Sequence, residues 1–246
     1  MRYILLFVLI FFPLFSQEKK QTITLGMGPY IQTQPYAGVD SVITPSPVIF
    51  FDNSLFYIRW TRIGLYFLGE KKEDFSWGFS LTAQPRIYGY DSSDISGMDK
   101  RETSFEGGLA FSIKMDKAYL ELMAVTDLVD RHDTWIYNAE VGYDLELGNF
   151  SFYPSVLASY QSSKFTNYYY GVTQIEATRK GESMYAPSSG LQLGIQTYIE
   201  YPFTKKLSAL VNIRADKLSS KASNSPLTND DYIYSGLASL IYTFEY

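Results

Sequence analysis

The sequence predicts an all-β protein, an antiparallel up-and-down β-barrel that spans a membrane. Long segments alternate apolar with polar residues, and this period of two is typical of a strand with one apolar and one polar face. Most of these segments are longer than the roughly five or six residues of an average strand. The chain also carries 22 Tyr, 17 Phe and 3 Trp among its 246 residues, and such rings gather where lipid meets water.

The main alternative is a soluble β-sandwich, whose strands also alternate. The buried face of a sandwich strand rarely carries aromatic rings at both ends, whereas here rings bracket the apolar face. In the last segment Tyr232 and Tyr234 lie at one end, and Tyr242 and Phe244 lie at the other. These are the positions of the two aromatic girdles of a transmembrane barrel. Beyond the amino terminus no segment approaches roughly 18 uninterrupted apolar residues, so a closed barrel is favoured over spanning helices.

Composition excludes several classes of function. The net charge is −5, so the chain lacks the excess of basic residues that is typical of a nucleic-acid-binding protein. Because the chain has no cysteine, it cannot hold a disulfide framework, a zinc ribbon, a catalytic thiol or a lipidated amino-terminal Cys. His132 is the single histidine, which rules out a multi-histidine metal site within one chain. We expect no cofactor.

The amino terminus has the layout of a secretory signal peptide. Arg2 supplies a positive charge, Tyr3–Phe15 is an uncharged apolar run, and Ser16 precedes a polar stretch. A membrane anchor is the alternative, but about 13 apolar residues fall short of the roughly 20 that a spanning helix needs. We therefore expect residues 1–16 to be removed and residues 17–246 to form the barrel in the outer membrane of a Gram-negative bacterium.

Twelve strands are expected along the mature chain. The first two are 22–32 and a strand within 41–52, and a short hairpin of 55–60 and 63–69 follows. If that hairpin does not span, the count falls to ten. The remaining strands lie at 75–87, 101–113, 117–127, 135–146, 150–162, 191–201, 206–216 and 232–246.

Connections alternate between short and long, which predicts the orientation. Tight turns lie at Lys114–Lys117, Gly148-Asn149 and Tyr201–Lys206, and the turn at Glu70–Asp74 is slightly longer. Longer polar loops lie at 91–100, 127–134, 163–188 and 217–231. Short turns on the periplasmic side and long loops outside are usual in such barrels. An even number of strands then places both ends of the mature chain in the periplasm.

Charged residues fall on the inward face of their strands. This is expected of a barrel, because a Lys or Arg facing lipid at mid-membrane costs about 2–4 kcal/mol. We predict that six polar positions line the lumen: Gln84, Arg86, Glu121, Glu140, Gln196 and Arg214. Such a lumen could conduct small solutes or be filled by its own side chains.

The 163–188 loop is the best candidate for contacts outside the cell. It carries Tyr168, Tyr169, Tyr170, Arg179, Lys180 and Tyr185, and Tyr and Arg are frequent at binding hot spots. The alternative places these tyrosines in the outer aromatic girdle. Acidic loop residues are candidates for binding divalent cations that bridge lipopolysaccharide molecules. Lipopolysaccharide and outer-membrane lipid are expected partners.

An enzymatic role was weighed and is not expected. Asp127, Asp130, His132 and Asp133 form the only cluster that offers a base with carboxylate partners, and rim serines such as Ser92 or Ser162 could supply a nucleophile. However, Asp-rich loops are ordinarily solvated turns, and the sequence contains no nucleophile elbow, zinc-protease motif or phosphate loop.

The carboxyl terminus resembles the insertion signal of bacterial outer-membrane barrels, which implies recognition by the barrel-assembly machinery. Leu240, Tyr242, Phe244 and Tyr246 alternate on one face, and the last is the terminal aromatic.

Short motifs in order along the mature chain resemble the MipA/OmpV family of outer-membrane β-barrels. They are Leu25-Gly-Met-Gly28, Tyr36-Ala-Gly38, Pro47-Val-Ile-Phe-Phe51, Ile63-Gly-Leu-Tyr66, Gly97-Met98 with Arg101, Asp127 with His132, Tyr169-Tyr-Gly-Val172 with Glu176, Tyr185, Ser225-Pro226 and Tyr242-Thr-Phe244. The chain departs from the pattern in its Glu245-Tyr246 extension and in Asp133 after His132. The resemblance implies a scaffold that joins a lytic transglycosylase to a penicillin-binding protein. A small-solute pore and a surface adhesin remain the alternatives.

Overall fold

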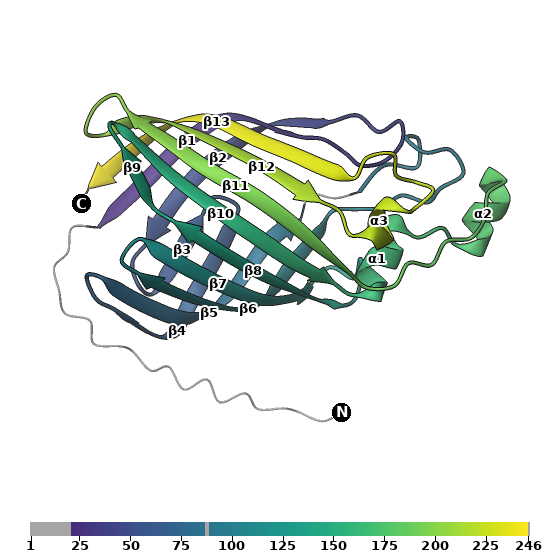
Figure 1. The fold of residues 1–246 in the computed structure, drawn as a ribbon, viewed down its shortest axis with the longest axis horizontal. Coiled ribbons are helices and arrows are strands. Elements are labelled where there is room, and N and C mark those ends of the chain that lie inside the picture. Colours follow the sequence, from purple (N-terminus) through teal and green to yellow (C-terminus); the bar gives the residue numbers. More distant parts are fainter. Residues whose placement is uncertain (1–20, 87–88, 246) are drawn as a thin grey trace.

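The computed structural model describes residues 21–86 and 89–245, which form a closed antiparallel barrel of twelve strands (Figure 1). The expected signal peptide at 1–16 and the terminal aromatic Tyr246 lie outside the described residues. None of the helices in the described part of the chain is long and apolar enough to cross a membrane.

Thirteen strand segments make the twelve strands of the wall. The segments are β1 (Thr22–Gln32), β2 (Val42–Asp52), β3 (Phe56–Arg59), β4 (Arg62–Lys71), β5 (Phe75–Arg86), β6 (Ser104–Met115), β7 (Ala118–Asp127), β8 (Trp135–Tyr143), β9 (Leu145–Leu147), β10 (Phe150–Gln161), β11 (Gly190–Pro202), β12 (Leu207–Lys217) and β13 (Tyr232–Glu245). Both β8 and β9 pair with β10 and are separated only by Asp144, so together they form one strand of the wall.

Each strand pairs with its neighbours in sequence, and the ends of the sheet meet. β1 pairs with β13, so that Met27 lies opposite Leu240, and β10 pairs with β11 to complete the circle. The predicted up-and-down barrel and its count of twelve strands are therefore confirmed. The expected hairpin at 55–69 is also present, with a first strand of only four residues, Phe56–Arg59.

The two ends of the barrel differ. The short turns and the carboxyl end of β13 lie at one end, which we call the periplasmic end (left in Figure 1). The opposite, outer end carries α1 (Ser163–Tyr170), α2 (Gln174–Lys180) and α3 (Ser220–Ser223). The longer polar loops that the sequence predicted at 163–188 and 217–231 are present, and they contain these short helices, which the sequence analysis did not predict. Side-chain hydroxyls of Ser162, Thr173 and Ser219 cap the three helices and accept bonds from backbone N–H groups of the first turns.

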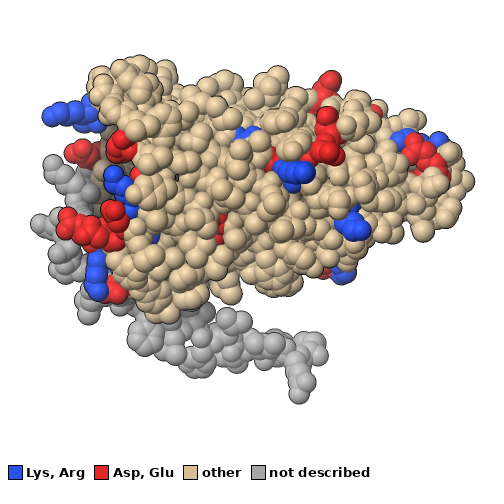
Figure 2. Space-filling model, viewed as in Figure 1, with Lys and Arg blue, Asp and Glu red and all other residues tan. Residues whose placement is uncertain are grey.

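The outward face of the wall is apolar. Exposed aliphatic side chains recur on most strands, and they include Leu81, Leu109, Val141, Val156, Ile195, Ile213 and Leu240. In Figure 2 the charged side chains gather toward the two ends of the barrel and are sparse in the band between them. This distribution is what a membrane-spanning wall requires, since a charge in the lipid-facing band is costly.

An apolar core closes the outer end. Its fully buried members come from the loops and helices rather than from one strand face: Tyr36, Met98, Phe165, Tyr169, Tyr170, Ala222 and Leu227. We call this region the outer cap. Among the described residues, this buried core lies above the strands and covers the outer end of the lumen.

Candidate functional site

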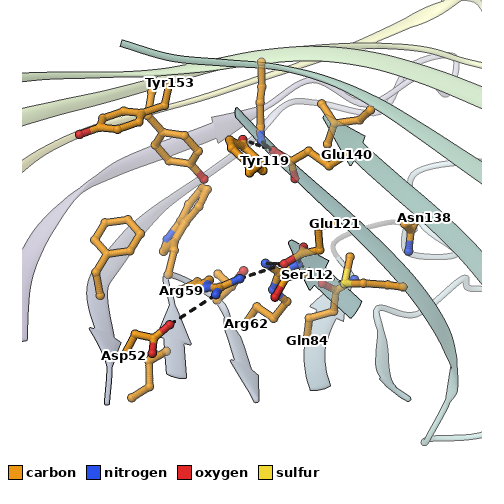
Figure 3. A pocket seen from close by; sticks show the side chains of 18 of the residues that line it. Asp52, Arg59, Arg62, Gln84, Ser112, Tyr119, Glu121, Asn138, Glu140 and Tyr153 are labelled. Atoms are coloured by element: carbon orange, nitrogen blue, oxygen red, sulfur yellow. Dashed lines mark hydrogen bonds and ion pairs between the residues drawn. The ribbon is translucent and has the colours of Figure 1, made fainter. Parts of the chain in front are cut away.

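The lumen contains a cavity of about 1370 Å³, which Figure 3 shows from close by. Inward-facing residues of nearly every strand line it, from Thr22 and Lys71 near the periplasmic end to Ile233 below the outer cap. All six positions that the sequence assigned to the lumen line this cavity: Gln84, Arg86, Glu121, Glu140, Gln196 and Arg214.

An ion cluster lies in the lumen. Glu121 on β7 receives Arg59 Nη1 and Arg62 Nη2, both at 2.9 Å from its Oε2, and Arg62 Nη1 bonds its Oε1. Figure 3 shows Arg59, Arg62 and Glu121 meeting in the pocket. The side chain of Glu121 is 6% exposed and that of Arg62 is 15% exposed. The cluster therefore ties the short β3–β4 hairpin to β7, from which β5 and β6 separate it.

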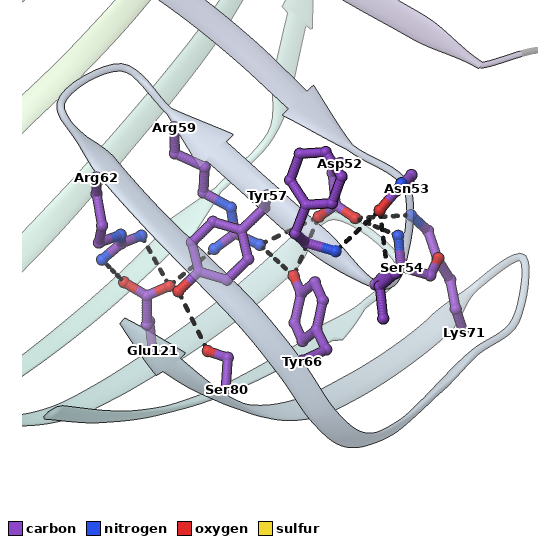
Figure 4. Close-up of polar contacts among 12 residues, drawn as sticks. Asp52, Asn53, Ser54, Tyr57, Arg59, Arg62, Tyr66, Lys71, Ser80 and Glu121 are labelled. Atoms are coloured by element: carbon purple, nitrogen blue, oxygen red, sulfur yellow. Dashed lines mark hydrogen bonds and ion pairs between the residues drawn. The ribbon is translucent and has the colours of Figure 1, made fainter. Parts of the chain in front are cut away.

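The same cluster continues toward the periplasmic end (Figure 4). Arg59 Nη2 donates to the Tyr66 hydroxyl at 2.8 Å, and this hydroxyl donates to Asp52 Oδ2 at 3.0 Å. Tyr57 lies beneath the Arg59 guanidinium, 4.3 Å from ring centroid to Cζ. Sequence reasoning missed Arg59, Arg62 and Asp52, although two arginines that flank a two-residue turn in a short hairpin were a visible signal.

Two further polar clusters occupy the lumen. Near the outer end, Arg86 Nη2 donates to Glu106 Oε2 at 2.9 Å, and His132 Nε2 lies 3.5 Å from the other oxygen of that carboxylate. Lower down, Glu140 Oε1 accepts the Tyr119 hydroxyl at 2.8 Å and Gln196 Nε2 at 2.9 Å. Every carboxylate in these clusters has charged or polar partners, which satisfies the requirement for burying such groups.

The acidic loop after β7 has a structural role. Asp127 accepts backbone N–H groups of Val129, Arg131, His132 and Asp133 through its two carboxylate oxygens. His132 is buried, and its ring packs 5.1 Å from that of Phe165 in the outer cap. Among the described residues, no group of three His, Cys, Asp or Glu side chains is placed to hold a metal ion.

The outer cap is held by a buried ion pair. Arg101 Nη2 donates to Glu176 Oε1 at 2.7 Å, and Glu176 is fully buried. Burial alone would raise the pKa of Glu176, but backbone N–H groups of Thr173 and Asp99, together with Arg101, lower it to about 2. Glu176 also completes a capping box with Thr173 at the start of α2, so one carboxylate stabilises both the helix and its contact with the Asp99–Arg101 segment.

The predicted external-contact residues fall into two groups. Tyr169 and Tyr170 are fully buried in the outer cap, and Tyr168 and Tyr185 are half-buried there. Arg179 is exposed and pairs with Asp99, while Lys180 pairs with Glu182. In this conformation the basic side chains of α2 are accessible to a partner and the buried tyrosines are not. Of the predicted insertion signal, Leu240, Tyr242 and Phe244 are exposed on the outward face of β13.

Comparisons with known proteins identify a family and several similar proteins. A family model described as "MltA-interacting protein MipA" matches residues 25–244. The chain is similar to the MltA-interacting protein of Escherichia coli (strain K12), at 25% identity over 91% of this chain and 90% of that protein. It is also similar to "Putative outer membrane protein YiaT" of the same organism, at 22% identity over 87% and 88%. Among solved structures, the CymD monoaromatic hydrocarbon channel aligns with a TM-score of 0.43 at 9% identity, over 93% of this chain and 90% of that one.

Proposed function

Because the chain belongs to the MltA-interacting protein MipA family of the Gram-negative outer membrane, we propose that it is a non-enzymatic scaffold for murein-remodelling enzymes. Its partners would be a lytic transglycosylase and a penicillin-binding protein, which act in the periplasm. The observation that carries this proposal is the likeness to a relative named for its interaction with MltA, along nine-tenths of both chains.

The arrangement of the barrel supports a periplasmic rather than an external partner. The outer cap closes the lumen toward the outside, whereas the periplasmic end presents exposed turns of mixed charge. The turn between β4 and β5 carries Lys72, Glu73 and Asp74, and the turn between β6 and β7 carries Asp116 and Lys117. Charged rims of this kind steer encounter and fix the register of a docked partner.

Affinity capture from gently crosslinked envelopes tests the proposal. The folded protein should enrich a lytic transglycosylase or a penicillin-binding protein over an unrelated barrel. A turn variant with Lys72, Glu73 and Asp74 all changed to Ser should lose that enrichment. A matched outer variant, with Arg179, Lys180 and Glu182 changed to Ser, should keep it. If the wild-type protein enriches neither enzyme over the control barrel, the scaffold proposal is refuted.

A small-solute pore is the second candidate, and the cavity of about 1370 Å³ favours it. Conduction along the axis would require the outer cap to open. The wild-type protein in a planar bilayer should then conduct poorly, and deletion of the cap segment 163–188 should raise single-channel conductance. Equal conductance of both proteins would argue against a capped pore.

A further inference from the structure

Among the described residues, β2 and β5 lack strand neighbours toward the outer end of the wall, where the β3–β4 hairpin does not reach. β2 pairs with β1 from Val42 to Phe51, but it pairs with β3 only through Phe50–Asp52. The last bond on that side runs from the backbone N–H of Trp60 to the carbonyl of Ile49, at 2.8 Å. Toward the outer end, within the described residues, the remaining stretch 42–48 has no backbone partner on its β3 side.

The facing edge is also unpaired. β5 pairs with β4 only as far as Ala83, opposite Ile63, while its last residues, Gln84 to Arg86, pair on the β6 side alone. The β3–β4 hairpin that should separate β2 from β5 therefore stops partway up the wall. Three strand spacings of about 4.8 Å would set the two edges roughly 14 Å apart at this level. We call this interruption the wall gap.

The hairpin ends where it does because its turn is anchored. Trp60 begins a two-residue turn with φ of 57°, a left-handed conformation that a bulky residue seldom adopts. Its backbone N–H is held by Ile49, and its indole Nε1 donates to Ser46 Oγ at 2.9 Å. Two bonds to β2 thus offset the strain of the turn and fix the lower boundary of the wall gap.

Prolines occupy three of the edge positions that face the wall gap. In a strand the N–H and C=O of alternate residues point to the same side, so Pro45 and Pro47 face the same way as Ile49, toward the missing neighbour. On the other edge, the carbonyl of Phe105 accepts a bond from Leu128, so its partner Pro85 faces away from β6 and into the wall gap.

This use of proline matches an edge in lipid. Because proline has no N–H, none of these three positions leaves an unsatisfied donor, which costs several kcal/mol in hydrocarbon. Two of the carbonyls have hydroxyl neighbours: Thr44 Oγ1 lies 3.4 Å from the Pro45 oxygen, and Ser46 Oγ lies 3.4 Å from the Pro47 oxygen. Prolines in sheets are confined to edges and bulges, so the sequence itself is adapted to a wall that is open here.

The cavity reaches the wall gap from inside. Residues from both edges and from the turn line it: Thr44, Ser46, Trp60, Thr61, Gln84 and Pro85. Beside the turn, aromatic and aliphatic side chains join these polar residues on the inner surface. Tyr30 meets Trp60 edge-on at 5.4 Å between centroids, and Val48 is fully buried in the same cluster. A hydrocarbon chain that entered here would pack on aromatic rings instead of water.

We propose that the wall gap is a lateral portal that admits a hydrocarbon chain of an outer-leaflet lipid into the lumen. The outer cap covers the outer end of the lumen, the wall gap lies in the outer half of the wall, and the cavity behind it extends to the periplasmic end. The portal thus gives the barrel a lipid-binding activity beyond the scaffold role, and its test does not depend on any protein partner.

Photo-crosslinking in cells tests the portal directly. p-Benzoylphenylalanine is placed at Thr44, which lines the lumen beside the wall gap, and in a separate protein at Ser159. Ser159 is the matched control. Like Thr44, it is a hydroxyl residue that lines the lumen and is the third residue from the outer end of its strand, but its strand is paired on both sides. Ile43, exposed on the outside at 71%, serves as the lipid-facing reference. Folding is checked by heat-modifiable electrophoretic mobility.

Intact-mass spectrometry after illumination gives the result. Lipid adducts at position 43 and at position 44, but not at position 159, are expected. Adducts at position 43 alone would overturn the portal. Adducts at 44 and 159 alike would also overturn it, since chains would then reach the lumen by a route other than the wall gap.

A fluorescence measurement gives an independent readout. The chain has three Trp, so the Trp77→Phe, Trp135→Phe background leaves Trp60 as the only emitter. In vesicles of phosphatidylcholine with brominated acyl chains, Thr44→Phe should reduce the quenching of Trp60 at least twofold. Ser159→Phe adds the same ring to the lumen and should leave it unchanged. Equal quenching in both variants would contradict entry through the wall gap.

Discussion

Removal of the Glu121 charge is predicted to destabilise the barrel through the lumen. In Glu121→Gln, the side chain keeps its shape but loses the charge that faces Arg59 and Arg62. Arg59 retains Asp52 at 3.4 Å and the hydroxyl of Tyr66. Arg62, whose side chain is 15% exposed, would have no carboxylate partner left among the described residues. Stripping a buried ion pair of one member costs about 3–5 kcal/mol. Because the lumen admits some water, we expect the free energy of unfolding to fall by about 3 kcal/mol, at the lower end of that range.

Equilibrium urea unfolding of the protein folded in detergent micelles, followed by tryptophan fluorescence, measures this loss. Glu140→Gln is the matched control, because Glu140 also projects into the lumen but accepts bonds from the neutral groups of Tyr119 and Gln196. A neutral amide can still accept one of those bonds, so its cost should stay near 1 kcal/mol. If Glu121→Gln costs no more than Glu140→Gln, the ion cluster does not hold the hairpin to β7 and the reasoning fails.

Three further predictions follow from the outer cap and the wall. The lowered pKa of Glu176 contributes stability that is present above its ordinary value of 4.5 and is lost as the pH falls toward 2. In limited proteolysis the outer cap should therefore be cleaved faster at pH 3 than at pH 7, and in the Glu176→Gln variant it should be cleaved equally fast at the two pH values. Pro47→Ala places a new N–H in the wall gap and should lower the unfolding free energy by about 1–3 kcal/mol in urea titrations, whereas a gain in stability would mean that the edge has a partner. Gly28→Ala would bring Cβ within 1.8 Å of the Ala238 carbonyl and should prevent β1 from closing on β13, measured as loss of the heat-modifiable band. Gly236→Ala, whose nearest neighbour atom is 3.3 Å away, should fold with a yield close to that of the wild type.

Most of the fold could be predicted from the alternation of apolar and polar residues. A period of two determines which side chains face lipid and which face the lumen, because successive Cβ atoms in a strand point to opposite faces. For that reason the six lumen positions, from Gln84 to Arg214, could be assigned without coordinates. The count of twelve strands also followed from the chain, since the turn between Arg59 and Arg62 separates two short alternating runs.

The outer loops were harder to predict, because their conformation depends on packing against one another. Thr173 and Glu176 form a capping box that is visible in the sequence, yet seven-residue helices such as α2 are marginal without tertiary contacts. The burial of Tyr169 and Tyr170 depends on segments far along the chain, such as the one that carries Tyr36, and no local pattern distinguishes a buried loop tyrosine from an exposed one.

The sequence by itself determined a barrel with an apolar outer face and a polar lumen. The reason is local: successive residues of each strand face lipid and lumen in turn, so the alternation of apolar and polar residues can be read without knowing the strand's neighbours. Only the tertiary structure decided which charges meet inside it. Glu121 finds Arg62 from 59 positions away, since the stagger of the strands sets which inward side chains share a level. The wall gap is also a property of the tertiary structure, because it forms where the short β3–β4 hairpin lies between the longer strands β2 and β5. The prolines at 45, 47 and 85 can be assigned to strand edges only when the pairing of β2 and β5 is known.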